Sequence, residues 1–308
     1  MRANGPDVPT PRPSPARSLR PNDPDVPAPR PSPPSPSPAR SLRTSEVTVA
    51  GVRSPVVETG PEGAEEAIVF VHGNPGRGRD WAPLMEPAGA FARTVALDMP
   101  GFAGADKPAG FPYTVPGYAA HLGGALEQLG VRRAHLVLHD FGGPWGLQWA
   151  ADHPEAHAST TLINTGVLLR EGWHALAKVW RTPGLGELFF AISSRRGQRA
   201  FMKATNPPTF PQSFADEMFD IYADKGTRRA VLRLYRNTPI GPHVEAIAPR
   251  LREHPRPALV VWGAKDPYLK VRLAERQREV FRDAAVTILP GSGHWPLADD
   301  PEAVVAAV

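Results

Sequence analysis

The stretch Ala134–Gly143, with the sequence AHLVLHDFGG, passes from a short apolar run into a pair of glycines without an intervening loop. Its first six residues predict a buried strand. Gly142 and Gly143 open a helix that we expect to continue to about Asp152. A strand that enters a helix through one residue makes a sharp turn and presents that residue at the mouth of the sheet. Here the presented residue is Asp140.

Short apolar β-type runs alternate with helical stretches on both sides of this segment. The alternation predicts an α/β fold with a mainly parallel sheet flanked by helices. The expected strands are Glu46–Ala50, Ser54–Glu58, Ala67–His72, Thr94–Asp98, Ala134–His139, Ser159–Asn164, Ala258–Gly263 and Ala285–Leu289. Besides the helix after Asp140, the expected helices are Val115–Leu129, Leu269–Arg282 and one that begins near Pro301.

Residues 165–246 have helical texture and no clear strand, whereas strand-rich sequence precedes and follows them. This order predicts a helical cap inserted into the sheet domain, not a second domain placed after it. We therefore expect a disordered Pro/Arg-rich tail over residues 1–44, an α/β core over residues 45–164 and 247–308, and the cap over residues 165–246.

The first 45 residues hold 14 of the 38 prolines and no aromatic residue, and DVPTPRPSP at Asp7–Pro15 returns as DVPAPRPSP at Asp25–Pro33. Proline fixes φ and lacks an amide donor, so this composition predicts a disordered extension rich in polyproline II. Two other interpretations stay open. The stretch is a ligand for aromatic-lined grooves, or it lies upstream of the start codon that is used.

The excess positive charge also belongs to the tail, which has seven arginines against three aspartates and leaves the remaining residues neutral. We therefore expect no nucleic-acid partner. The absence of cysteine excludes disulfides, thiolate metal sites and a cysteine nucleophile. No apolar run approaches the roughly 18 residues of a membrane span, and the Met1 end lacks the apolar core of a secretory signal. We expect a cytoplasmic protein without a membrane span.

Polar side chains follow four of the predicted strands at their C-terminal ends, where open parallel sheets bind ligands. They lie in the loop His72–Gly76, at Asp140, at Asp266 in GAKDPY and at His294 in GSGHW. A helix N-terminus favours an ionised Asp140, and an ionised carboxylate can attack an sp³ carbon that bears a leaving group. The alternative role for Asp140 is that of an ordinary helix cap. The order Asp140, Asp266, His294 matches nucleophile, acid and base in hydrolases with a nucleophile at such a turn.

Five motifs carry a family resemblance: HGNP at His72–Pro75, DMPGFAGADKP at Asp98–Pro108, LHDFGG at Leu138–Gly143, WGAKDP at Trp262–Pro267 and GHWPLADDPEAV at Gly293–Val304. With them, residues 46–308 resemble an α/β-hydrolase. The aspartate at the turn, where many hydrolases have serine, is similar to the haloalkane dehalogenase and epoxide hydrolase group. The resemblance implies the α/β-hydrolase fold, a cis peptide before Pro75, and an oxyanion hole made by the main-chain amides of Asn74 and Phe141. We expect no cofactor and no metal.

The mechanism implied by the resemblance has two steps. Asp140 attacks carbon and forms an alkyl-enzyme ester. His294, oriented by Asp266, then deprotonates a water molecule that attacks the ester carbonyl. The implied substrate is a small hydrophobic molecule, with water as the co-substrate.

The leaving group separates the two activities of this group. An epoxide opens to an alkoxide and needs a proton donor, for which the predicted cap offers Tyr222 and Tyr235. The motif LYRN at Leu234–Asn237 resembles the cap tyrosine motif of epoxide hydrolases. The other tyrosine of that family, early in the cap, has no match in this sequence.

A halide leaves as an anion and needs N–H donors instead. Dehalogenases resemble this chain in the side chain of Asn74 and in a strand-end asparagine such as Asn164. Their tryptophan after the nucleophile is Phe141 here, which has no N–H to donate. Trp173 and Trp180 in the predicted cap offer an N–H, but we expect them to serve in packing. We therefore expect epoxide hydrolysis, with haloalkane dehalogenation as the alternative. A non-catalytic binding protein of the same fold is a lesser alternative.

Overall fold

The structure is a computed structural model that describes residues 41–167, 172–239 and 246–308. The predicted disordered tail lies outside the described residues, apart from its C-terminal end. There Arg43 and Thr44 belong to the first strand, β1 (Arg43–Val49), and pair with Glu58 and Val57. The predicted boundary after residue 44 is wrong to this extent, because strand pairing already begins at Arg43.

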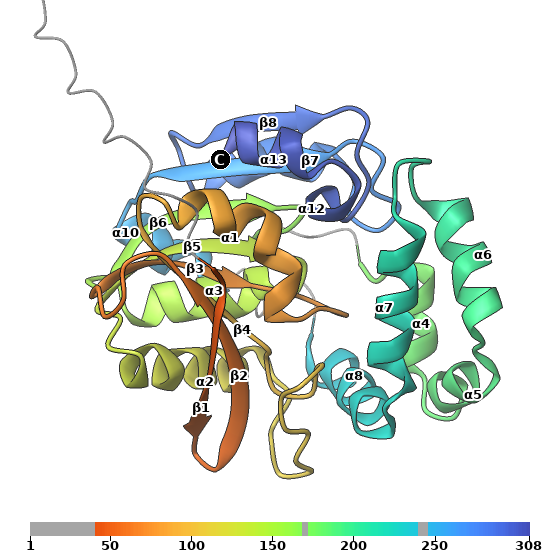
Figure 1. The fold of residues 1–308 in the computed structure, drawn as a ribbon. Coiled ribbons are helices and arrows are strands. Elements are labelled where there is room, and N and C mark those ends of the chain that lie inside the picture. The colour runs from red at the N-terminus through yellow and green to blue at the C-terminus, as the bar shows by residue number, and fades with distance from the viewer. Residues whose placement is uncertain (1–40, 168–171, 240–245) are drawn as a thin grey trace, which may run out of the picture. The chain divides into compact units, whose positions relative to one another are not determined.

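The described residues form one eight-stranded sheet with the order β1-β2-β4-β3-β5-β6-β7-β8. The strands after β1 are β2 (Val52–Thr59), β3 (Glu66–Val71), β4 (Arg93–Leu97), β5 (Arg133–His139), β6 (His157–Ile163), β7 (Ala258–Gly263) and β8 (Ala285–Leu289). Strands β1 and β2 are antiparallel to their neighbours, and all other pairs are parallel. The predicted mainly parallel sheet is therefore confirmed (Figure 1).

Helices cover both faces of the sheet (Figure 1). They are α1 (Ala82–Ala88), α2 (Val115–Gln128), α3 (Gly142–Asp152), α10 (Ala248–Glu253), α11 (Arg272–Arg276), α12 (Pro296–Asp299) and α13 (Pro301–Ala307), with the short 3₁₀ turns η1 (Gly78–Trp81) and η2 (Gln277–Glu279). Alternate side chains of each strand point to opposite faces. In β5, Leu136 and Leu138 pack into the apolar cluster that contains α2 and α3, whereas Val137 packs into the cluster that contains α1 and α13.

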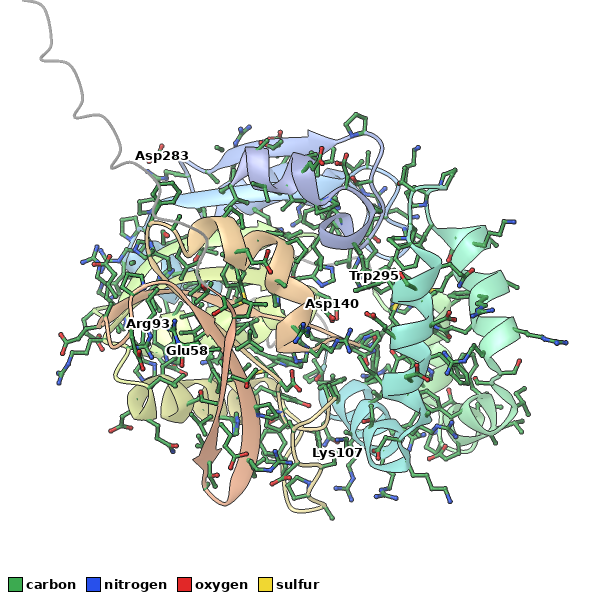
Figure 2. The ribbon with its side chains drawn as sticks, viewed as in Figure 1. Glu58, Arg93, Lys107, Asp140, Asp283 and Trp295 are labelled. Atoms are coloured by element: carbon green, nitrogen blue, oxygen red, sulfur yellow. The ribbon has the colours of Figure 1, made fainter. Side chains whose placement is uncertain are left out.

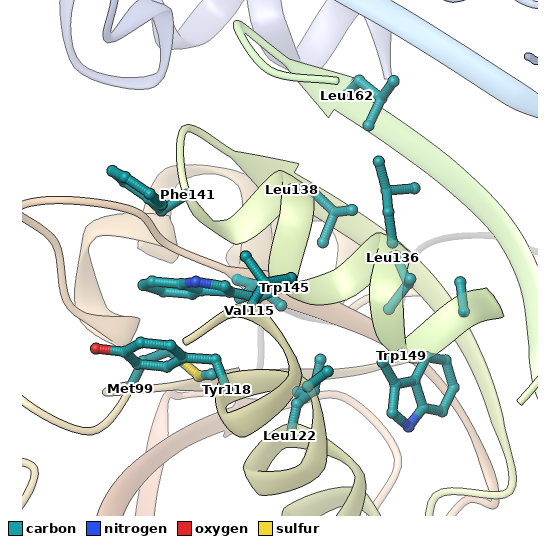
Figure 3. Packing of buried hydrophobic residues seen from close by; sticks show 14 of the residues in the cluster. Met99, Val115, Tyr118, Leu122, Leu136, Leu138, Phe141, Trp145, Trp149 and Leu162 are labelled. Carbon is teal, nitrogen blue, oxygen red and sulfur yellow. The ribbon is translucent and has the colours of Figure 1, made fainter. Parts of the chain in front are cut away.

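The packing of α3 fixes the position of Asp140. Figure 3 shows Trp145 of α3 beside Tyr118 of α2, and the two rings stack with centroids 3.9 Å apart. Leu138 and Leu162 belong to the same buried cluster. Because α3 starts two residues after Asp140, the helix that these contacts hold against the sheet also holds the turn before it.

One predicted helix is shorter than expected. Residues 269–282 contain only α11 and η2, and α11 begins at Arg272. The carboxylate of Asp266 accepts hydrogen bonds from the backbone amides of Tyr268 and Leu269, at 2.7 and 2.9 Å. These bonds keep the chain in a turn, as aspartate side chains commonly do after a strand.

Within residues 172–239, five helices follow one another after β6 and precede α10 and β7 (Figure 1). They are α4 (Ala175–Arg181), α5 (Leu185–Ile192), α6 (Arg195–Thr205), α7 (Gln212–Ala223) and α8 (Lys225–Asn237). The described residues of this insertion include no strand, in line with its helical texture. Arg77 of the core connects to the insertion through a 2.5 Å hydrogen bond to Glu217 of α7. No helix in the described parts of the chain combines the length and the apolar character needed to cross a membrane.

Arg93, at the start of β4, is a buried cation that joins three segments of the core. Its guanidinium donates to Glu58 of β2 at 2.7 and 3.0 Å, and to the carbonyl oxygens of Ala64 and Leu129 at 2.9 Å each. Figure 2 shows Arg93 and Glu58 close together. Removing such a cation leaves a carboxylate and two carbonyls without their donor.

We predict that Arg93→Met lowers the free energy of unfolding by about 3 kcal/mol or more, because these acceptors then stay buried without a hydrogen-bond donor. Urea unfolding measures the loss. The control is Arg132→Met, which breaks an ion pair with Glu65 at the surface and should cost less than about 1 kcal/mol. Equal losses in the two variants would contradict the structural role of Arg93.

Candidate active site

Asp140 occupies the sharp turn between β5 and α3, on the side of the core that faces α7 (Figure 2). Its φ is +47°, in the left-handed region that non-glycine residues seldom adopt. The turn is held from several sides. Thr165 Oγ1 donates to the Asp140 carbonyl oxygen at 2.6 Å, and the Asn74 amide donates to Asp140 Oδ1 at 2.7 Å. Strained backbone that its surroundings hold in place is common at functional sites.

Two glycines make room for this turn. A Cβ at Gly73 would lie 2.3 Å from Asp140 Oδ1, and a Cβ at Gly142 would lie 2.2 Å from the carbonyl oxygen of Val71. A Cβ atom does not approach a non-bonded oxygen so closely. The first turn of α3 and the loop after β3 therefore need glycine to bring Asp140 against the Asn74 amide.

The structure brings the three predicted catalytic side chains together. His294 Nδ1 lies 2.7 Å from Asp266 Oδ2, and His294 Nε2 lies 3.4 Å from Asp140 Oδ2. Each side chain follows a different strand of the sheet, as the sequence order implied, and all three are at most partly exposed. The histidine thus stands between two carboxylates, with one ring nitrogen toward each.

Asn164 directly follows β6 and connects that strand to Asp266. Its Nδ2 donates to Asp266 Oδ2 at 2.7 Å, and its Oδ1 accepts the Gly263 amide at 2.9 Å. The side chain is fully buried. The side-chain amide of Asn164 is therefore occupied by Asp266, the carboxylate that contacts His294.

Charge at the centre is set by burial and by ion pairing. Burial alone would raise the pKa of Asp140, but the hydrogen bond and charge of His294, with the Asn74 amide, lower that pKa to about 2. Burial would lower the pKa of His294, but the charge of Asp266 and the hydrogen bonds with both carboxylates raise it to about 10. At neutral pH, Asp140 is therefore an anion beside a protonated His294.

The predicted oxyanion-hole residues both flank Asp140. The peptide between Asn74 and Pro75 is cis, as the resemblance implied. The Asn74 amide points at Asp140 Oδ1, as described above. Phe141 is the N-cap of α3 and directly follows Asp140, so its amide lies at the start of that helix. A helix N-terminus favours negative charge at this position.

Tyr222 of α7 and Tyr235 of α8 meet the side chain of Asn74. Tyr222 Oη lies 3.2 Å from Asn74 Oδ1, and Tyr235 Oη lies 3.2 Å from Asn74 Nδ2. Both tyrosines belong to the predicted cap, and the LYRN motif assigns Tyr235 to the site. Burial raises the pKa of both phenols well above the usual value, and the charge of Asp140 adds to the effect on Tyr235. Both hydroxyls therefore keep their protons.

A mostly apolar cavity of about 330 Å³ opens in front of Asp140 and His294. Two of the residues that line it, His174 and Tyr268, are not among the site residues predicted from sequence. His174 caps α4 by accepting the Ala177 amide at 3.2 Å, and burial lowers the pKa of His174 to about 4. The ring of Tyr268 packs 5.0 Å from that of His294. Tyr268 could have been suspected, because it follows the predicted acid by two residues. Trp173, Trp180 and Leu176 also line the cavity.

Nothing in residues 41–167, 172–239 and 246–308 groups three His, Asp or Glu side chains in a way that could hold a metal ion. The arrangement found instead combines an anionic carboxylate, a histidine paired with a second carboxylate, and two neutral phenols around an apolar cavity. Such a site can perform nucleophilic and general acid–base chemistry on an apolar molecule.

Comparisons with known proteins give the family. The chain is 24% identical over 279 residues to a cis-3-alkyl-4-alkyloxetan-2-one decarboxylase of Xanthomonas campestris, a match that covers 84% of this chain and 91% of the relative. It is 23% identical over 290 residues to epoxide hydrolase 2 of Caenorhabditis elegans, covering 88% and 80%. Among solved structures, haloalkane dehalogenase DbeA of Bradyrhizobium elkani has a similar fold, with a TM-score of 0.74 at 22% identity over 86% of this chain and 95% of the other. The model of the alpha/beta hydrolase family matches residues 68–307. The chain therefore belongs to the alpha/beta hydrolase family.

Proposed function

We propose that this hydrolase acts through an alkyl-enzyme ester on Asp140 and that its substrates are epoxides of small hydrophobic molecules. The observation that carries the choice of epoxides is the contact of Tyr222 and Tyr235 with Asn74, whose own amide holds the Asp140 carboxylate. A nucleophile and two phenols thus contact one residue, Asn74, the first through its backbone amide and the others through its side chain, at the wall of an apolar cavity.

In the first step, Asp140 Oδ2 forms a bond to a ring carbon while the bond from that carbon to the epoxide oxygen breaks. The electron pair goes to the oxygen, which takes a proton from a tyrosine. Oδ1 stays on the Asn74 amide and becomes the ester carbonyl oxygen. After the first step, protonated His294 returns a proton to the tyrosinate through solvent and becomes neutral. In the second step, neutral His294 removes a proton from water and the resulting hydroxide attacks Asp140 Cγ. The ester C–O bond then breaks, the departing alkoxide takes the remaining proton of the hydroxide, and the diol leaves the Asp140 carboxylate beside protonated His294.

The charge balance explains why His294 is idle in the first step and active in the second. Its pKa of about 10 depends in part on the Asp140 carboxylate. Formation of the ester removes that negative charge, so the pKa of His294 falls. The ring then gives its proton to the tyrosinate through solvent, and the neutral imidazole can accept a proton from water. Asp266 remains ionised and orients the ring through its 2.7 Å hydrogen bond.

The side-chain amide of Asn74 decides which of the two phenols can donate a proton to the epoxide oxygen. An amide side chain donates hydrogen bonds from nitrogen and accepts them at oxygen, so it can accept a hydrogen bond from only one of the two tyrosines. The other tyrosine accepts a hydrogen bond from the amide and has its own O–H available. In either orientation of the amide, one phenolic proton is therefore ready for the epoxide oxygen.

Haloalkane dehalogenation is the alternative, favoured by the position of Asn74 beside the nucleophile. It requires an N–H next to the leaving halide, and the residue after Asp140 is Phe141, whose ring cannot donate one. In the arrangement described above, Asn74 Nδ2 is engaged by Tyr235. The tyrosine pair therefore supports epoxides over halides.

We predict that His294→Gln stops the reaction at the ester, because attack by Asp140 needs no base while hydrolysis does. Intact-protein mass spectrometry should find about one equivalent of adduct, located on the peptide that contains Asp140. Epoxides, alkyl halides and oxetan-2-ones form the substrate panel. An epoxide adds its whole mass, and a halide adds its mass less that of HX.

The double variant Asp140→Asn/His294→Gln is the matched control and should carry no adduct. If His294→Gln also shows none with a substrate that the wild type consumes, the ester route is wrong. A protein that turns over no member of the panel and forms no adduct would support the lesser alternative, a non-catalytic binding protein.

We also predict that Tyr222→Phe/Tyr235→Phe slows ester formation from epoxides by about 100-fold or more, because the epoxide oxygen then becomes an alkoxide that no tyrosine protonates. Stopped-flow or quenched-flow kinetics measure this step. With an alkyl halide of similar size the same variant should change the rate by less than about tenfold, since halide needs no proton. Equal effects on both substrates would argue against a proton-donating role.

A further inference from the structure

Exposed apolar side chains gather on α5 and α6. Within the described residues, nine large apolar side chains are exposed, and four of them belong to these two consecutive helices. They are Leu185, Leu188, Ile192 and Phe201, with exposed fractions from 40% to 72%. The three on α5 are spaced three and four residues apart and so share one face of the helix. We call these four residues the α5–α6 apolar face.

This face is continuous with the candidate active site. Ile192 and Phe201 belong to it and also line the cavity in front of Asp140. A side chain that borders the cavity and is exposed to solvent lies at the entrance. Figure 1 shows α5 and α6 on the outer edge of the insertion, away from the sheet. The entrance of an apolar cavity therefore has an apolar border on the outside of the molecule.

Positive charge accompanies the apolar face. Helix α6 has four basic residues and no acidic one. Arg195 and Arg199 form ion pairs with Asp220 and Asp216 of α7. Arg196 and Lys203 of the same helix are exposed, and neither has an ion-pair partner among the residues that the structure describes. Two uncompensated cations thus stand on the helix that carries Phe201.

We propose that the α5–α6 apolar face docks on a lipid surface with anionic headgroups, so that apolar substrates enter the cavity from the lipid past Ile192 and Phe201. Apolar side chains beside lysine and arginine are the pattern of segments that lie in a membrane interface. Arg196 and Lys203 would meet the negative surface. The inference does not depend on which residue is the nucleophile.

Charge disfavours a second copy of this chain as the occupant. In a dimer with twofold symmetry, the same patch meets itself. Arg196 and Lys203 of one copy would then approach the same cations of the other. The carboxylate that α5 carries, Glu187, is already paired with Arg236. An anionic lipid surface supplies the opposite charge directly.

The test is co-sedimentation of the full chain with vesicles of phosphatidylcholine that contain about 30% phosphatidylglycerol. We expect the wild type to bind these vesicles and to bind phosphatidylcholine alone much less. Leu185→Ser/Leu188→Ser removes two apolar side chains that do not line the cavity. It should weaken vesicle binding by about tenfold or more with an unchanged melting temperature.

The matched control is Phe91→Ser, which removes an exposed apolar side chain between α1 and β4, away from the insertion. It should bind vesicles like the wild type. Binding of Leu185→Ser/Leu188→Ser at wild-type strength would overturn the proposal, because the contact with lipid would then lie elsewhere, as on the arginine-rich first residues. Absence of wild-type binding would overturn it too. So would a wild-type dimer in sedimentation velocity that this variant abolishes, because a second copy would then cover the face.

Discussion

The hydrogen bond from the Asn74 amide to Asp140 Oδ1 is the contact on which the rest of the site depends. It joins the loop after β3 to the turn after β5, and it fixes the carboxylate although Asp140 has a left-handed backbone. Glycine at position 73 makes the approach sterically possible. The side chain of the same asparagine meets Tyr222 and Tyr235. One residue therefore contacts the Asp140 carboxylate of the core and the phenols of the helical insertion.

The second constraint is electrostatic. His294 lies between Asp266 and Asp140, and the three groups together carry one net negative charge when the histidine is protonated. Alkylation of Asp140 would neutralise one carboxylate and leave His294 with a single partner. In the proposed mechanism, the same pairing that keeps Asp140 ionised would thus release His294 as a base once the ester has formed. Asn164 contributes by holding Asp266, which is why it is not available to a ligand.

Much of this could be predicted from sequence, because strands and turns leave local signals. The eight strands were recognised from apolar runs, and Ala258–Gly263 and Ala285–Leu289 have the predicted bounds. The sharp turn at Asp140 is predicted by an apolar strand that runs into a pair of glycines. Contacts between distant segments leave no such signal. Tyr222 meets Asn74 across 148 residues, and that meeting depends on how the insertion packs on the core. The length of α11 was missed because the Asp266 side chain, not the helical propensity of the segment, decides where the helix begins.

The central claim is that the oxygen delivered to the substrate comes from Asp140 and not from water. A single turnover in water enriched in the heavy oxygen isotope, with enzyme in excess over an epoxide, tests it most directly. We predict that the first product carries no label and that the label appears in the peptide containing Asp140, because water attacks the carboxyl carbon of the ester. A product that is fully labelled in the first turnover, with an unlabelled Asp140 peptide, would mean that water attacks the substrate directly and would contradict the account.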